Sequence, residues 1–170
     1  MERSILLVSA GLDHPSLPAR FLLRRALVAM PGYRFRRAAS LEDLPSQPSF
    51  RAIVLYVHAE TISPTALERL DRFLLQGGGL LAIHAASASF KEQPRFFELL
   101  GGQFVKHGPV ESFEVQPAEP AGDLFAGIPP FSVTDELYRH QCDPGNRIHF
   151  YTTVGDEREP VVWTRYHGSG

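Results

Sequence analysis

The first hundred residues alternate between apolar runs and amphipathic segments, which predicts strands alternating with helices. Residues 4–11, 51–58 and 80–84 are short continuous apolar runs, typical of strands that are buried on both faces. Residues 33–40 alternate polar and apolar side chains, as an outer strand does. Helices are predicted over 15–30 and 63–76, with a short third helix from 93 that ends at Gly101 and Gly102.

After residue 102 the pattern changes to strands joined by turns. The expected strands are 109–117, 131–140, 147–154 and 160–168. We expect them to extend or cap one side of the sheet as antiparallel strands, with a proline-rich loop over 117–130 that is long enough to border a pocket. The predicted fold is therefore α/β, an open, doubly wound and mainly parallel sheet with helices on both faces and an antiparallel C-terminal extension.

Composition narrows the classes of protein that this chain can belong to. The 170 residues suggest one domain, and 44% hydrophobic with 21% charged residues is ordinary for a globular protein. The net charge of −2 without a basic run argues against nucleic acid or an anionic membrane as a partner. We expect a cytoplasmic protein, because no apolar stretch reaches about 18 residues, the start lacks a signal-peptide pattern, and Cys142 is the single cysteine.

Several histidines follow predicted strands, at the edge where open α/β sheets bind their ligands. They are His14, His58 and His84, with His107 close behind the third helix. The pair Asp135 and Glu136 supplies carboxylates. Such a set can exchange protons near neutral pH, and several histidines with a glutamate can also hold zinc or another divalent metal. No close metal-ligand spacing is present, so the pattern leaves both readings open.

The usual nucleophiles are not where their chemistry needs them. Cys142 lies in a turn-like stretch far downstream of the strand end at His84. Ser87 and Ser89 lack the glycines of a serine elbow, and the glycines at 77–79 precede a strand and not a helix, unlike a phosphate loop. A covalent mechanism and a dinucleotide site are therefore not expected.

Four blocks, "GGGLLAIHAASASF", "FFELLGGQFVKHGPV", "FSVTDELYRH" and "PVVWTRYHGSG", together resemble the ThuA-like, trehalose-utilisation family. The early "GLDHPS" fits that family's first strand-to-helix turn, so the resemblance covers nearly the whole chain. It implies a flavodoxin-like fold related to class I glutamine amidotransferases, with His84 in place of the elbow cysteine. Amide hydrolysis through a thioester is then not expected, and the implied ligand is a sugar or an oxidised sugar.

The resemblance also supplies candidate residues. It implies His84 and Glu136 as catalytic groups, and as substrate-binding groups His14, His107, Asp135, Tyr138 and Trp163. Strand alternation turns Asp135 and Glu136 to opposite faces, and the motif position favours Glu136. A metal, if bound, would take His84 and His107. His58, His140, His149 and His167 are expected to be structural or exposed, and Tyr138 and Trp163 have core packing as their alternative role.

The sequence is compatible with three functions. The first is an enzyme that acts on a disaccharide or keto-sugar by His/Glu acid–base chemistry, as an isomerase or lyase. The second is a non-catalytic module that binds carbohydrate or protein, and the third is a metal-dependent hydrolase that uses the same site. We expect residues 1–170 to form one ThuA-like domain that lacks the family's last strand. An edge left by that strand would favour a homo-oligomer.

Overall fold

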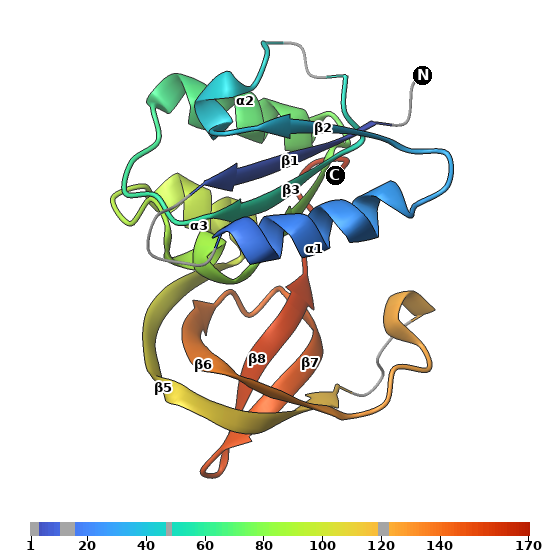
Figure 1. The fold of residues 1–170 in the computed structure, drawn as a ribbon. Helices are drawn as coiled ribbons and strands as arrows, with labels where there is room; N and C mark the ends of the chain where they lie inside the picture. The colour runs from blue at the N-terminus through green and yellow to red at the C-terminus, as the bar shows by residue number, and fades with distance from the viewer. Residues whose placement is uncertain (1–3, 11–15, 47–48, 119–122) are drawn as a thin grey trace. The chain divides into compact units, whose positions relative to one another are not determined.

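The chain divides into two compact units (Figure 1). The structure is a computed structural model that describes residues 4–10, 16–46, 49–118 and 123–170. Unit 1 comprises Met1–Leu99 with Tyr166–Gly170, and unit 2 comprises Leu100–Arg165. The expectation of one domain that lacks a last strand stays a prediction.

Unit 1 contains the parallel sheet that the apolar runs predict. Its strands are β1 (Ser4–Ala10), β2 (Arg34–Ala38), β3 (Ala52–Val57) and β4 (Gly79–Ala82). They pair in the order β2-β1-β3-β4, and every pair is parallel. β1 and β3 are the central strands and are almost entirely buried, which is why their sequences are continuous apolar runs.

Helices cover both faces of this sheet, with α1 on one side and α2 and α3 on the other (Figure 1). These helices are α1 (Ser16–Val28), α2 (Pro64–Leu75) and α3 (Pro94–Leu100), and the 3₁₀ helices of unit 1 are η1 (Leu41–Asp43) and η2 (His84–Ala88). The 3₁₀ helix η3 (Asp123–Phe125) belongs to unit 2. α2 begins where predicted, because the Ser63 hydroxyl accepts the Ala66 N–H at 3.1 Å and Pro64 needs no N–H partner there. None of the described helices has the length and apolarity that crossing a bilayer requires.

Unit 2 is built on an antiparallel sheet of its own. Its strands are β5 (Gly102–Pro117), β6 (Phe131–Cys142), β7 (Arg147–Val154) and β8 (Glu157–Thr164), in the order β6-β5-β7-β8. The predicted fold class is thus confirmed, although these strands form a second sheet and do not extend the hydrogen bonding of the first. β5 also starts at Gly102, well before the predicted residue 109.

The early start of β5 has a local cause at the end of α3. Gly101 has φ of +72°, a conformation that only glycine adopts readily, and it turns the chain directly from helix to strand. The Asn146 side chain packs against it and donates its amide N–H to the Gly101 carbonyl at 2.5 Å. The sequence pattern marked the end of the helix correctly, but the strand that follows depends on the distant β6–β7 turn.

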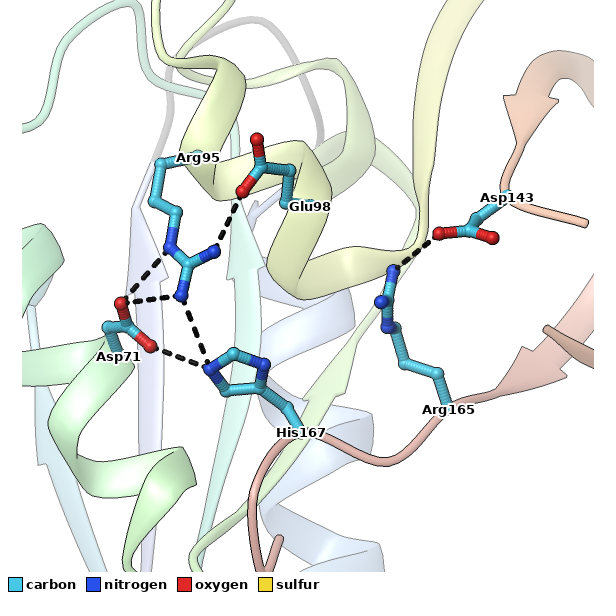
Figure 2. A network of polar contacts seen from close by, with 6 residues as sticks. All are labelled: Asp71, Arg95, Glu98, Asp143, Arg165 and His167. Carbon is cyan, nitrogen blue, oxygen red and sulfur yellow. Dashed lines mark hydrogen bonds and ion pairs between the residues drawn. The ribbon is translucent and has the colours of Figure 1, made fainter. Parts of the chain in front are cut away.

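The last residues of the chain form a tight turn at Gly168 and pack against Leu75 of α2. His167 and Gly170 exchange two backbone hydrogen bonds, and Gly168 has φ of +63°. The His167 ring donates to Asp71 Oδ1 at 2.7 Å, and Arg95 binds Asp71 Oδ2 at 2.8 Å (Figure 2). Burial tends to raise the pKa of Asp71, but the hydrogen bonds from Arg95 and His167 outweigh it and leave the pKa lowered.

Two adjacent glycines test how tightly unit 1 is packed. A Cβ at Gly78 would overlap the Phe73 ring, which is only 4% exposed, whereas a Cβ at Gly79 would lie 3.6 Å from Ala52 Cβ, an ordinary contact. We expect G78A to lower the free energy of unfolding by about 1–3 kcal/mol, and G79A to change it by less than about 1 kcal/mol. Urea denaturation measures both, and equal midpoints for the two variants would contradict this packing.

The Asp71 network predicts a pH dependence of stability. Because folding lowers the pKa of Asp71, its contribution is complete above the unfolded value of about 3.9 and disappears as pH falls through the folded value. D71N should lower the free energy of unfolding by about 1 kcal/mol at pH 7, and the gap to the parent should begin to narrow as pH falls below about 4. Urea titrations from pH 7 to 3 measure this gap. The matched control is D156N in the exposed β7–β8 turn, and a gap as large at pH 3 as at pH 7 would be the contrary result.

Candidate functional site

An interruption of the β5–β6 ladder defines the first group of predicted site residues, in unit 2. The register shifts between Phe104 and Lys106 and again between His107 and Val110. Pro109 has no N–H, so the ladder cannot continue through the Gly108–Pro109 pair, and the extra residues form a bulge. The His107 ring donates from Nδ1 to the Gly108 carbonyl at 2.8 Å, which fixes its orientation within that bulge.

The bulge brings His107 close to Glu136 on the neighbouring strand. His107 Nδ1 lies 3.7 Å from Glu136 Oε1, and the two side chains are 42% and 29% exposed. Asp135 does not join this pair: it is exposed, and its Oδ1 accepts the backbone N–H of Glu136 at 2.8 Å. Among the predicted residues of unit 2, the structure thus places an imidazole and a carboxylate together where solvent reaches both.

A row of rings continues from this pair across unit 2. Tyr138 stacks on His107 at 5.6 Å and lies 6.2 Å from His140, whose ring meets Trp163 edge-on at 5.1 Å. Trp163 donates from Nε1 to the Leu100 carbonyl at 2.8 Å. Tyr138 is buried and Trp163 is half-buried, so both pack as core aromatics and also connect to the pair.

Sequence reasoning missed two members of this row. His140, expected to be structural or exposed, packs between Tyr138 and Trp163, which is a structural role. Phe104 lies 4.6 Å from Tyr138. The spacing of Glu136, Tyr138 and His140 at every second residue of one strand was a signal for His140, because such residues share a face. No sequence signal pointed to Phe104, which joins the row only through the register of β5 against β6.

In unit 1, His84 occupies a strained position at the end of β4. Ile83 is extended, and His84 has φ of +49° and begins η2. A non-glycine residue in the left-handed region costs about 1–2 kcal/mol and is typical of functional turns between a strand and a helix. The strand-end position predicted for His84 is therefore present, with the geometry of an elbow.

A buried serine holds this elbow in place. The Ser89 hydroxyl is fully buried, lies 3.1 Å from the Val57 carbonyl and 3.0 Å from the Ala85 carbonyl, and accepts the Ala59 N–H. It therefore ties the end of β3 to η2. The Ser87 hydroxyl donates to the His84 carbonyl at 3.0 Å. Neither serine is arranged as a nucleophile, in keeping with the absence of a serine-elbow motif.

The remaining histidines divide as follows. His14 lies outside the described residues. His58 donates its backbone N–H to the Ala10 carbonyl and has a half-buried side chain. His149 is buried and hydrogen bonds with the Thr164 hydroxyl at 2.8 Å, so it is structural, as expected. His167 belongs to the Asp71 network.

The described groups can exchange protons and form hydrogen bonds. Burial raises the pKa of the Cys142 thiol to about 11, and the nearby Glu159 carboxylate adds to the rise, so the thiol is protonated at neutral pH. Within the described ranges no three side chains of His, Cys, Asp or Glu are grouped to hold a metal ion. His84 and His107, the predicted metal ligands, belong to different units. The metal-bound reading stays a prediction.

Comparison with known proteins defines the class. The chain is similar in fold to two ThuA-like proteins, from Parabacteroides merdae (TM-score 0.84, 17% identity, 99% of this chain and 77% of that one) and Bacteroides uniformis (0.78, 14%, 98% and 78%). A glutamine amidotransferase from Thermotoga maritima has a TM-score of 0.61 at 10% identity, over 99% of this chain and 73% of that one. No match was found among curated proteins.

These neighbours share the flavodoxin-like architecture of the glutamine amidotransferases. The sequence pattern of the family described as ThuA, trehalose utilisation, matches residues 4–170. The chain therefore belongs to the ThuA family, which confirms the resemblance seen in the sequence.

The strain at His84 gives a stability test that needs no ligand. Glycine normally destabilises a regular position by about 0.5–1 kcal/mol relative to alanine, but alanine pays about 1–2 kcal/mol in the left-handed region. We therefore expect H84G to be at least as stable as H84A, by up to about 1 kcal/mol. Chemical denaturation of the two variants measures the difference. The same exchange at Ala66, inside α2, is the control and should favour alanine; H84A clearly more stable than H84G would contradict the strain.

Proposed function

We propose that this ThuA-family protein acts on a disaccharide or keto-sugar. In this proposal the His107–Glu136 pair of unit 2 transfers a proton from the carbon next to the sugar carbonyl. The distance of 3.7 Å between His107 Nδ1 and Glu136 Oε1 carries the proposal, because an imidazole and a carboxylate in reach of one another and of solvent can act on one small substrate. Membership of a trehalose-utilisation family supports a sugar as that substrate. A cytoplasmic location is part of the proposal.

The proposed step removes a proton next to a sugar carbonyl. Glu136 accepts the proton from the carbon beside the carbonyl, while His107 in its protonated form gives a proton to the carbonyl oxygen. The electron pair of the broken C–H bond forms the C=C bond of an enediol. Isomerisation is complete when Glu136 returns the proton to the former carbonyl carbon and the other enediol hydroxyl loses its proton to His107 as the new C=O bond forms. In an elimination the first C=O bond re-forms with return of its proton to His107, and the alkoxide expelled from the β-carbon takes the proton held by Glu136.

His84 is proposed as a second participant, on the strength of its strained strand-end position in unit 1. The sharing of proton transfer between His84 and Glu136 stays a prediction. We expect H84A to slow proton exchange on the keto-sugar, followed by NMR in D₂O as for E136Q. Exchange in H84A equal to that of the parent would refute a role for His84.

The first experiment is proton exchange on trehalose and on its 3-keto derivative in D₂O, followed by NMR, with binding measured by calorimetry. We expect E136Q and H107N to slow exchange on the keto-sugar by about 10²–10⁴-fold while changing its dissociation constant by less than about threefold. The control is S112A, an exposed residue of β5 whose hydroxyl bonds Thr134 at 2.6 Å. Exchange in E136Q equal to that of the parent would refute the role of the pair.

A non-catalytic carbohydrate-binding role is the second candidate. The stacked His107 and Tyr138 rings favour it, because ordered rings beside a carboxylate suit recognition of a sugar without chemistry. Saturable binding by the parent with no proton exchange, lost in H107N, would select this role. Exchange that disappears with a chelator and returns with zinc would select the metal-dependent alternative.

A further inference from the structure

α1 has an apolar outer face in addition to the face that packs on the sheet. Leu23 and Leu27 contact the core cluster of Ile5, Leu7 and Val54. Phe21 and Val28, seven residues apart and thus on one line of the helix, are 63% and 61% exposed. A helix with apolar side chains on two sides is normally packed against other residues on both. Among the described residues, none buries the side that carries Phe21 and Val28.

The exposed apolar side chains of this outer face are surrounded by basic ones. Residues 16–40 contain six arginines and no acidic residue, in a chain whose net charge is −2. Arg24 and Arg25 are exposed on α1, next to Phe21 and Val28. Arg37 on β2 pairs with Leu7, whose side chain lies in the cluster under α1, so Arg37 belongs to the same face of the sheet. Among the described residues none of these three arginines makes an ion pair.

We call Phe21, Arg24, Arg25, Val28 and Arg37 the basic surface. Guanidinium groups around exposed apolar side chains suit a partner that offers carboxylates around apolar side chains. β2 is also the outer strand of its sheet, and its arginines prevent simple strand addition at that edge. The partner is therefore expected to dock through side chains.

Unit 2 carries the complementary surface. It contains ten acidic residues against five basic ones, whereas unit 1 contains nine against twelve. On its sheet Glu111 of β5 stands directly opposite Asp135 of β6, and the partly exposed pair Phe113 and Val133 follows two residues along on the same face. Two like charges directly opposite each other destabilise a sheet unless a cation lies against them.

We propose that the basic surface of one copy of this chain binds the acidic surface of a second copy, the latter defined by Glu111, Phe113, Val133 and Asp135. The basic surface combines guanidinium groups with apolar side chains, and the acidic surface combines carboxylates with apolar side chains. In the proposed contact the guanidinium groups meet the carboxylates, and the apolar side chains of the two surfaces pack together. The contact joins two different patches, so two reciprocal contacts give a twofold dimer, and successive single contacts give rings or open chains. Strand alternation turns Glu136 to the opposite face from Asp135, so this inference is independent of the proposed function.

Sedimentation velocity of the whole protein at low and high salt tests the contact. The parent should associate at 50 mM salt and dissociate as salt rises, because the attraction between exposed charges is screened. The double variants R24E/R25E and E111K/D135K should each raise the dissociation constant by about tenfold or more. Mixing the two variants should restore association, since each then supplies the charge that the other has lost.

The control is R72E, an exposed arginine on α2, which should associate like the parent. A parent that stays monomeric at every concentration, or charge-reversed variants that associate unchanged, would overturn the proposal. A monomeric parent that binds vesicles of phosphatidylglycerol and phosphatidylcholine, with binding lost in R24E/R25E, would also overturn it and assign the basic surface to lipid. Circular dichroism of each variant establishes that the substitutions leave the fold intact.

Discussion

The break in the β5–β6 ladder at Gly108 and Pro109 is the constraint on which the candidate site in unit 2 depends. Proline offers no N–H, and the adjoining glycine adds freedom, so the two strands must pair on either side of a gap. On one side of the gap His107 pairs with Tyr138, and on the other side Val110 pairs with Glu136. The His107 ring therefore stacks on Tyr138 and lies near the Glu136 carboxylate. An uninterrupted ladder would fix His107 by pleat and register alone. The close approach of His107 and Glu136 is thus a consequence of a missing backbone donor.

In unit 1 the strained backbone of His84 is offset by buried hydrogen bonds of Ser89. The left-handed backbone at His84 costs about 1–2 kcal/mol. The Ser89 hydroxyl accepts the Ala59 N–H and donates its one proton to the Val57 or the Ala85 carbonyl, and each such buried hydrogen bond contributes about 1 kcal/mol to the fold. Because Ser89 binds both β3 and η2, relaxing the elbow would break contacts on two elements at once. The small residues after His84 allow that close packing, since Ala85 and Ala86 are fully buried.

The parts of the structure that could be predicted from sequence are those decided locally. Continuous apolar runs specified β1 and β3, and the Ser63–Pro64 start specified α2, because burial on two faces and helix capping act over a few residues. The start of β5 could not be predicted, since it depends on Asn146 packing against Gly101. His140 and the His167–Asp71 contact were missed for the same reason: their partners are fixed by strand register and by chain segments far apart in sequence.

A buried carboxylate connects the two outer strands of the antiparallel sheet and so supports the ring row. Glu159 of β8 accepts from Arg139 Nε at 2.5 Å and from the His140 backbone N–H at 2.9 Å, although β6 and β8 stand at opposite ends of the strand order. The sheet must therefore curl until its outer strands meet. Burying this carboxylate is costly in itself, so its two hydrogen bonds do more to specify one arrangement than to add stability. That arrangement holds β6, which carries Glu136, Tyr138 and His140, beside β8, which carries Trp163. The packing of His140 against Trp163 thereby also supports Tyr138, on which the His107 ring stacks.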